Sequence, residues 1–187
     1  EENAASHSLA ASQEFFLVDP LDGTKEFIKA CGDGAFTVNI GLIKNAEPVM
    51  GIVFAPALDR LFFGSLGNGA FEISGGICRQ ICVRIPPAEG PVAVASASHR
   101  DAQTNQWLEK RGVTNSIAIG SSLKFCLIAA GEADLYPRYG PTMEWDTAAG
   151  DAVLRAAGGR VMAEDGKPFP YGKAGYRNQP FFAAGGG

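Results

Sequence analysis

The sequence predicts a layered sandwich of mixed α+β and α/β character, in which helices cover β-sheets. Two observations carry this prediction. Residues 36–74 contain short apolar stretches separated by turn residues, which is the pattern of antiparallel strands in a meander. After residue 91 the pattern changes to strands that alternate with helices, which is typical of an α/β layer. With 187 residues, 46% of them hydrophobic, the chain is long enough to bury a core in one or two domains.

The first strand is expected at residues 15–18, an apolar run that leads to Asp19. It should end at Pro20, because proline cannot donate to a sheet ladder. A helical turn is expected to begin near Thr24. The meander that follows is expected to contain strands at residues 36–44, 48–55, 60–64 and 70–74.

A proline-rich segment at residues 86–91 is the predicted boundary between two domains, residues 1–86 and residues 87–187. Proline there favours an extended connector. The second domain is expected to contain strands at residues 92–96, 116–119 and 133–137, and helices at residues 100–111, from Ser121 or Ser122 to about 131, and around Asp146 up to the glycines at 158–159.

Charge and cysteine usage limit the class of protein. A net charge of −4 argues against a nucleic-acid polymer as partner, but a small phosphorylated ligand needs only a local basic patch. No apolar run reaches the roughly 18 residues of a transmembrane segment. The four cysteines lack the spacing of a zinc site or a disulfide framework, which fits a reducing cytoplasm. We therefore expect a cytoplasmic protein.

Residues 19–24, Asp-Pro-Leu-Asp-Gly-Thr, are the strongest candidate for chemistry. The carboxylates of Asp19 and Asp22, with the Leu21 carbonyl between them, are hard oxygen ligands of the kind that Mg²⁺ prefers. Gly23 lets the backbone approach a ligand, and free N–H groups at a turn beginning near Thr24 would bind an anion. Asp-Pro and Asp-Gly also occur in ordinary turns, which is the alternative for this motif alone.

A second candidate lies at residues 145–159, which read as a helix with an acid at its start and glycines at its end. Asp146 is expected at or near the N-cap. A plain capping role is the alternative for this residue. Since ligands in open α/β layers bind beyond the carboxyl ends of strands, four polar residues that follow predicted strands are also candidates. These are His99, Ser121, Lys124 and Arg138, although His99 as a local cap and Lys124 on a solvated helix face are alternatives.

The two motifs together resemble the two signatures of the inositol monophosphatase superfamily, in the same order and over nearly the whole chain. The extension Lys25-Glu26-Phe27 resembles the 3′(2′),5′-bisphosphate nucleotidase branch of that family. The resemblance implies the family's αβαβα fold and a lithium-sensitive hydrolase of sulfur assimilation that uses two or three Mg²⁺ ions. The implied reaction removes the 3′-phosphate of adenosine 3′,5′-bisphosphate, with 3′-phosphoadenosine 5′-phosphosulfate as a further substrate. An inositol monophosphatase and a non-catalytic nucleotide-binding protein are the alternatives.

The resemblance also implies residue roles. Glu1 precedes Asp19 by 18 residues, a spacing that matches a metal-ligating glutamate of the family, whereas a frayed terminus is the alternative. The family has helices before that glutamate, and we expect this chain to lack them and to be less stable and poorly active alone. The implied metal ligands are Glu1, Asp19, Leu21, Asp22 and Asp146. The implied catalytic residues are the four acids of that set together with Thr24. The residues implied to bind the small phosphorylated nucleotide are Leu21, Gly23, Thr24, Lys25, His99, Ser121, Lys124 and Arg138.

Overall fold

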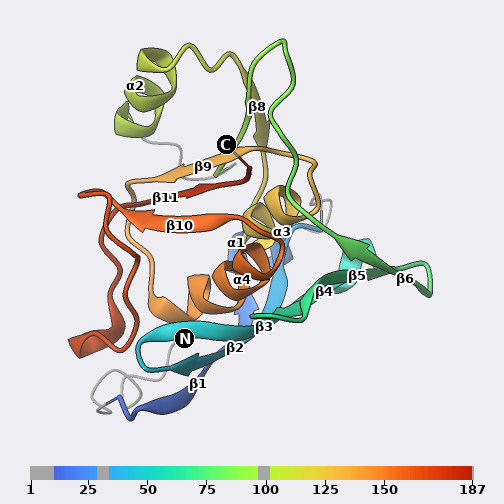
Figure 1. Cartoon of the computed structure of the whole chain (residues 1–187), viewed down its shortest axis with the longest axis vertical. Coiled ribbons are helices and arrows are strands. Elements are labelled where there is room, and N and C mark those ends of the chain that lie inside the picture. Colours follow the sequence, from blue (N-terminus) through green and yellow to red (C-terminus); the bar gives the residue numbers. More distant parts are fainter. Residues whose placement is uncertain (1–10, 29–33, 97–101, 187) are drawn as a thin grey trace.

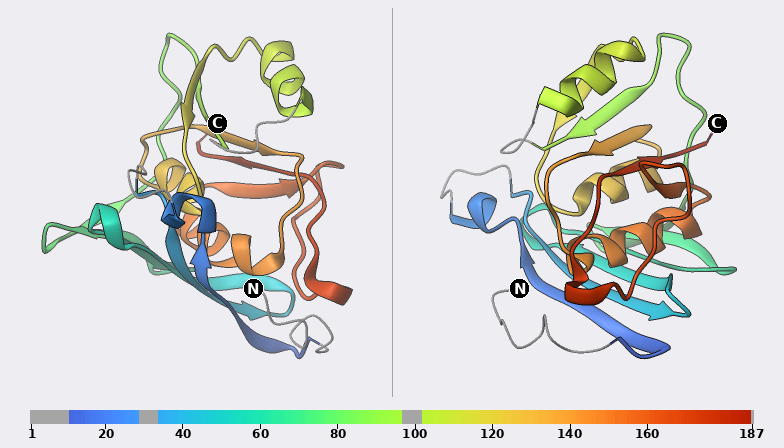
Figure 2. Two further views of the ribbon diagram at one scale, coloured as in Figure 1. Left: turned by 180° about the vertical axis from the view of Figure 1, so that it is seen from behind. Right: turned by 90° about the vertical axis from the view of Figure 1, so that its left-hand side faces the viewer.

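The computed structural model describes residues 11–28, 34–96 and 102–186 of the chain (Figure 1). Two β-sheets lie one above the other in these ranges, with helices α3 (Leu123–Ala129) and α4 (Glu144–Ala156) between them. Helix α2 (Ala102–Lys110) lies on the outer side of the second sheet, as the two views of Figure 2 show. This layered arrangement of sheets and helices confirms the predicted fold class.

The first sheet is antiparallel and has six strands in chain order. The four strands expected in the meander are confirmed, whereas β6 was missed because most of its residues are exposed and show no alternating pattern. The strands are β1 (Glu14–Asp22), β2 (Thr37–Lys44), β3 (Glu47–Ala55), β4 (Arg60–Ser65), β5 (Gly69–Ser74) and β6 (Ile77–Ile81).

Strand β1 does not end at Pro20 as predicted. It continues to Asp22, and the ladder changes register on the way: Asp19 pairs with Asn39, whereas Asp22 pairs with Thr37. Three steps along β1 therefore face two steps along β2, which is a β-bulge. Pro20 lies within the bulge, where the regular ladder is interrupted. In addition, β1 lies at an edge of the sheet, where a missing N–H donor is tolerated. The short helix α1 (Thr24–Ile28) follows directly, which confirms the predicted turn.

Helix α4 approaches the inner face of the six-stranded sheet closely at two positions, where no side chain separates the two backbones. Glycines on β2 and β3 make this possible: a Cβ at Gly41 would lie 2.8 Å from the Ala148 Cβ, and one at Gly51 would overlap the Ala149 carbonyl oxygen. The helix begins at Glu144 with Met143 as its N-cap residue, so Asp146 is the third helical residue and not the cap. Asp146 therefore lies near the N-cap, as predicted, and its side chain accepts a hydrogen bond from the backbone amide of Met143.

The second sheet has five strands in the order β10-β11-β9-β7-β8, of which β7 and β8 are parallel. The strands at residues 92–96, 116–119 and 133–137 are confirmed to within a few residues, and β10 and β11 lie beyond the last predicted helix. The bounds are β7 (Val92–Ala95), β8 (Asn115–Ala118), β9 (Leu135–Arg138), β10 (Arg160–Ala163) and β11 (Phe181–Ala184), with 3₁₀ turns at Pro56–Leu58 and Ala174–Tyr176.

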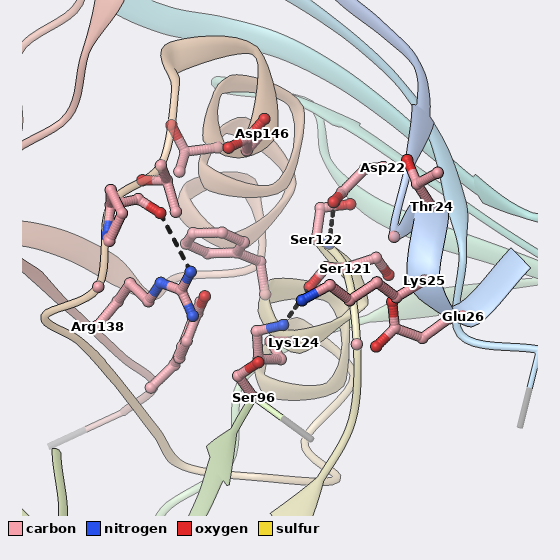
Figure 3. A pocket seen from close by; sticks show the side chains of 18 residues that line it. Asp22, Thr24, Lys25, Glu26, Ser96, Ser121, Ser122, Lys124, Arg138 and Asp146 are labelled. Atoms are coloured by element: carbon pink, nitrogen blue, oxygen red, sulfur yellow. Dashed lines mark hydrogen bonds between the residues drawn. The ribbon is translucent and has the colours of Figure 1, made fainter. Parts of the chain in front are cut away.

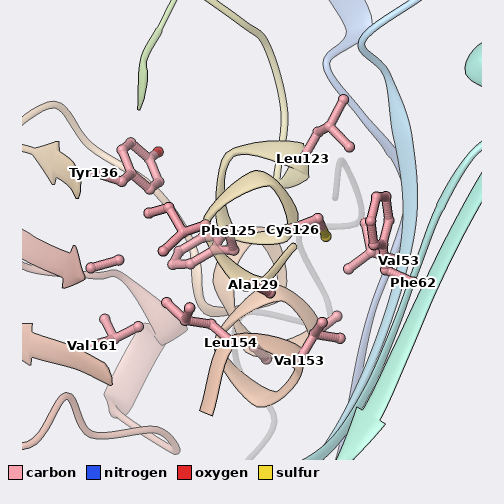
Figure 4. Packing of buried hydrophobic residues seen from close by; sticks show 14 of the residues in the cluster. Val53, Phe62, Leu123, Phe125, Cys126, Ala129, Tyr136, Val153, Leu154 and Val161 are labelled. Carbon is pink, nitrogen blue, oxygen red and sulfur yellow. The ribbon is translucent and has the colours of Figure 1, made fainter. Parts of the chain in front are cut away.

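Apolar side chains from both sheets and both central helices form one buried cluster (Figure 4). Phe62 enters it from the first sheet and Val161 from the second, with Phe125 and Leu154 between them. The division of the chain into two domains near residue 86 stays a prediction. In the part of the chain that the structure describes, no helix is long and apolar enough to cross a membrane.

The contact between α4 and the sheet leads to a stability prediction. Replacing Gly51 by alanine should destabilise the protein by about 3 kcal/mol, because the new methyl group meets the backbone of α4, which cannot move without disturbing the core. The matched control is Gly67→Ala, at a turn with φ of 83° where nothing lies within 4 Å of the new Cβ, so that only backbone strain of about 1 kcal/mol is added. Urea unfolding followed by circular dichroism measures both, and equal losses would contradict the packing argument.

Candidate active site

A pocket of about 350 Å³ opens where five chain segments meet: the end of β1, the end of β7, the loop before α3, the end of β9 and the start of α4 (Figure 3). The bulged end of β1 and the short helix α1 supply one wall, and the loop from β9 to α4 supplies the opposite wall. Segments that are far apart in sequence thus converge on one cavity. Among its lining residues are eight of the predicted site residues: Asp22, Gly23, Thr24, Lys25, Ser121, Lys124, Arg138 and Asp146.

Four predicted site residues are not in this lining. Asp19 is fully buried on β1, on the other side of the bulge from Asp22. Its Oδ1 accepts a hydrogen bond of 3.0 Å from the Leu21 amide. This bond holds the Leu21 peptide beside the Asp19 carboxylate, next to the pocket but not in its wall. Glu1 and His99 lie outside the described residues.

The pocket also contains residues that the sequence reasoning missed. Glu26 is only 8% exposed, and its side chain lies so close to Gly120 that a Cβ there would be 2.8 Å from the Glu26 carboxyl carbon. Ser96 follows β7, and the same strand-end argument that selected Ser121 would have found it. Tyr136 and Thr142 also line the pocket and were not among the predicted site residues.

One end of the pocket is acidic, because Asp22 at the end of β1 and Asp146 in the first turn of α4 both line it (Figure 3). Oδ2 of Asp22 accepts a hydrogen bond of 2.5 Å from the Ser122 amide. Burial raises the pKa of Asp22 above its ordinary value, although the charge of Lys124 acts in the opposite direction. Oδ2 of Asp146 accepts a 2.7 Å bond from the Met143 amide, so this residue both stabilises the helix start and faces the pocket.

The other end of the pocket carries the cations Lys124 and Arg138, with the acid Glu26 close enough to act on the charge of Lys124. Lys124 is 4% exposed, which rules out the solvated helix face that was its alternative. Its Nζ donates to the Ser121 carbonyl at 2.6 Å and lies 5.2 Å above the ring of Tyr136. Burial lowers the pKa of Lys124 to about 8. Arg138 donates from Nη2 to the Pro141 carbonyl at 3.2 Å, whereas its buried Nε has no hydrogen-bond partner among the described residues.

The acidic end is chemically suited to Mg²⁺. Its donors are carboxylate oxygens, with a backbone carbonyl close by at Leu21. Since burial raises the pKa of Asp22, the protein's own cations do not fully offset its charge, and a divalent cation would do so. No group of three acidic, histidine or cysteine side chains converges tightly enough in the described ranges to hold a metal unaided.

Comparison with known proteins identifies the family. The family model described as "Inositol monophosphatase family" matches residues 1–181. The chain belongs to the inositol monophosphatase family. It is 50% identical over 159 residues to the 3′(2′),5′-bisphosphate nucleotidase CysQ of Escherichia coli K12, which covers 85% of this chain and 63% of that protein. It is 43% identical over 173 residues to the CysQ of Buchnera aphidicola, covering 91% of this chain and 64% of that protein.

Solved structures of the family have the same fold. CysQ from Bacteroides thetaiotaomicron superposes with a TM-score of 0.84 at 41% identity, over 92% of this chain and 70% of that one. An inositol monophosphatase from Anabaena superposes with a TM-score of 0.76 at 28% identity, over 94% and 68%. The chain thus spans somewhat under two thirds of the length of the E. coli and Buchnera relatives.

A buried polar network stands behind the start of α4 and supports the acidic end of the pocket. Asp151 is fully buried and accepts hydrogen bonds from Arg155 Nε at 2.7 Å and from the Tyr171 hydroxyl at 3.0 Å. The same hydroxyl lies 3.2 Å from Oγ1 of Thr147, which lines the pocket. Burial raises the pKa of Asp151 to about 6, although Arg155 and Tyr171 both favour its ionised form.

This network leads to a pH prediction. Because the pKa of Asp151 is higher in the folded than in the unfolded chain, its contribution to stability is fully present below about pH 3.8 and is lost as pH rises through about 6. Relative to Asp151→Asn, the wild type should therefore lose about 2–3 kcal/mol between pH 4 and pH 7.5. Urea unfolding of both proteins at each pH measures the difference, in which other titrating groups cancel. A difference that stays constant with pH would show that the Asp151 pKa is not raised.

Proposed function

We propose that the protein is a Mg²⁺-dependent phosphomonoesterase that removes the 3′-phosphate of adenosine 3′,5′-bisphosphate, giving AMP and phosphate, with 3′-phosphoadenosine 5′-phosphosulfate as a further substrate. The observation that carries the proposal is the division of one pocket into an acidic end at Asp22 and Asp146 and a cationic end at Lys124 and Arg138. A substrate with two phosphates suits such a pocket, because one phosphate can be cleaved at the acidic end while the other is held at the cationic end.

The residues that would hold two or three Mg²⁺ ions are Asp22 and Asp146 in the pocket, Asp19 and the Leu21 carbonyl beside it, and Glu1. When bound, Mg²⁺ would lower the pKa of a coordinated water and neutralise charge on the phosphoryl oxygens. The role of Asp19 is consistent with its burial, since a carboxylate that is fully buried needs compensation by a cation or by hydrogen bonds.

The phosphate to be cleaved would lie at the start of α1. The first N–H groups of a helical turn have no partner within the turn, so the amides of Gly23 and Thr24 would donate to phosphate oxygens. Gly23 has a φ of 89°, a conformation that glycine adopts without strain. The Thr24 hydroxyl would orient the attacking water, and Lys25 would add positive charge. Water then forms a new O–P bond while the bond from phosphorus to the 3′ oxygen breaks, and that oxygen leaves with a proton.

The second phosphate would bind at the cationic end. Lys124 presents a buried ammonium group, and Arg138 presents the Nε donor that has no protein partner in the described ranges. Charge-assisted bonds of this kind are stronger than neutral ones, and stronger still where water is excluded. Ser121 and His99 complete the proposed substrate-binding set. Support for a nucleotide as substrate also comes from the E. coli and Buchnera relatives, which are named as 3′(2′),5′-bisphosphate nucleotidases.

Phosphate release separates this proposal from its two alternatives. The protein should release phosphate from adenosine 3′,5′-bisphosphate only with Mg²⁺, much faster than from inositol 1-phosphate, and lithium should inhibit the reaction. Faster release from inositol 1-phosphate would identify an inositol monophosphatase. Binding of the nucleotide without release of phosphate, at any Mg²⁺ concentration, would identify a nucleotide-binding protein.

Removing the acidic end should abolish turnover while the fold is kept. We expect Asp22→Asn and Asp146→Asn each to lower Mg²⁺-dependent kcat by a factor of at least about 10², because the amide is neutral and binds Mg²⁺ weakly. Asp165→Asn is the control, since this acid is exposed and pairs only with Lys167 in the described structure. Steady-state phosphate release at saturating Mg²⁺ and thermal unfolding measure the effects. A variant that retains near-normal kcat would remove its residue from the proposed ligand set.

The cations Lys124 and Arg138 should determine the preference for a substrate with two phosphates over one with a single phosphate. We expect Arg138→Ala and Lys124→Met to lower kcat/KM for the bisphosphate about ten-fold to a hundred-fold, because each removes a charge-assisted contact worth roughly 1.5–3 kcal/mol. Methionine is chosen at the buried lysine because it keeps the packing of the stem. The reference substrate is adenosine 3′-monophosphate, which lacks the second phosphate. Equal losses on both substrates would show that these residues act on the reaction or on folding.

A further inference from the structure

A group of uncharged polar side chains lies buried directly behind Asp22. Thr37 and Asn39 are on the inner face of β2 and are fully buried, and Ser122, at the N-cap of α3, is 2% exposed. Such side chains are costly to bury unless their hydrogen bonds are satisfied. None of the three was a candidate from the sequence, and only Ser122 lines the pocket.

The hydrogen bonds of this group have one consistent arrangement. The Ser122 hydroxyl donates to Oδ1 of Asn39 at 2.6 Å, which uses its single hydrogen. The 3.0 Å contact between the hydroxyls of Thr37 and Ser122 then has Thr37 as the donor. With Oδ1 of Asn39 occupied by Ser122, Nδ2 of the same amide faces Asp22 at 3.5 Å. Reversing the amide would place its oxygen against a carboxylate oxygen, which is repulsive.

Two donors from this group reach the same oxygen of Asp22. Oδ2 receives the Ser122 amide at 2.5 Å, and Nδ2 of Asn39 lies 3.5 Å from it. Oγ1 of Thr37 also lies 3.5 Å from Oδ2, but its single hydrogen is donated to Ser122, so Thr37 acts by holding the Ser122 hydroxyl that orients Asn39. The longer contact from Asn39 is weak, but it approaches the same side of the carboxylate as the Ser122 amide. A carboxylate held in this way on one oxygen presents the other in a fixed direction.

The fold itself creates this arrangement. The bulge in β1 places Asp22 opposite Thr37 in the ladder, with Asn39 two residues further along the same face of β2. Ser122 comes from a turn 100 residues later in the chain, and Ser121 before it has a left-handed backbone with φ of 51°. A strained non-glycine residue next to a site is often retained for its geometric effect. Here it directs the Ser122 amide to the carboxylate.

We propose that Thr37, Asn39 and Ser122 are positioning residues that commit Oδ2 of Asp22 to protein donors and leave Oδ1 to bind a divalent cation. The inference rests on the proposed function only in taking Asp22 as a ligand of Mg²⁺. Residues that orient a metal ligand from behind commonly change metal affinity by about ten-fold to a hundred-fold when they are replaced. Magnesium should be sensitive to this orientation, because it demands nearly octahedral geometry.

The test measures Mg²⁺ binding directly, in the absence of substrate, by isothermal titration calorimetry. Ser122→Ala keeps the amide that donates to Asp22 but removes the hydroxyl that orients Asn39, and Thr37→Val removes the hydroxyl that holds Ser122. We expect each to raise the Kd for Mg²⁺ about ten-fold or more. Thr37→Ser keeps the hydroxyl and should restore a Kd near that of the wild type. Thr104→Val is the matched control, because it removes a hydroxyl that is similarly buried, on α2 and outside the pocket lining. At saturating Mg²⁺, KM for the nucleotide should be unchanged in all variants.

The outcomes separate the two proposals. A Kd for Mg²⁺ that is the same in Thr37→Val, Ser122→Ala and the control would overturn the positioning role, whatever the wild type hydrolyses. If the wild type binds Mg²⁺ and the variants bind it weakly, but no phosphate is released from the bisphosphate nucleotide, the positioning role stands and the proposed function fails. If the wild type binds no Mg²⁺, both fail. Should Ser122→Ala not fold, the pair Thr37→Val and Thr37→Ser still decides the question, because valine keeps the shape of the buried side chain.

Discussion

The close contact between α4 and the six-stranded sheet is the constraint on which the rest of the structure depends. Gly41 and Gly51 remove the side chains that would otherwise separate helix from sheet, and Ala148 and Ala149 fill the remaining space. The distance between α4 and the sheet determines where the first turn of the helix lies, and that turn contains Asp146. The same packing therefore joins the core to the acidic end of the pocket. A helix held further from the sheet would leave Asp146 displaced from Asp22.

Two oppositely charged residues of the pocket, Asp22 and Lys124, have pKa values that burial shifts. Asp22 carries a raised pKa, whereas Lys124 carries a lowered one, and burial is the main cause of both shifts. Each residue thus stands in a site that disfavours its ionised form, although the two attract one another. Such paired perturbations are common at functional sites, where a ligand supplies the missing compensation. A cation at one end and a phosphate at the other would relieve both.

Polar networks outside the pocket hold its two walls in place. Behind α4, Asp151, Arg155 and Tyr171 form a buried cluster that reaches the pocket through Thr147. Glu144, the fully buried first residue of α4, accepts hydrogen bonds from the amides of Gly172 and Lys173 and so attaches that loop to the helix start. Beside the end of β1, Thr37 and Asn39 on β2 and Ser122 before α3 hold Asp22. Networks that are fully satisfied in this way favour a single arrangement of the core over its alternatives.

The sequence by itself determined the features that have local causes. Turn residues and apolar alternation marked the strands of the meander. The motifs at residues 19–24 and 145–159 located four residues that line one pocket, namely Asp22, Gly23, Thr24 and Asp146. The division into two domains, and the roles of Glu1 and His99, which lie outside the described residues, stay predictions. Features with local signals could be predicted because their energies depend on neighbouring residues: a capping carboxylate, a turn glycine, a strand of period two.

Only the tertiary structure decided what depends on distant partners. Pro20 ends a strand by local rules, yet β1 runs on to Asp22 because the bulge against β2 and the position at a sheet edge accommodate it. Lys124 resembles a surface residue, and its burial is visible only once Tyr136 and the turn at Ser121 surround it. The bond from the Ser122 amide to Asp22 spans 100 residues of sequence. No local pattern encodes such a pairing, since its geometry arises only when the start of α3 packs against the inner face of β2.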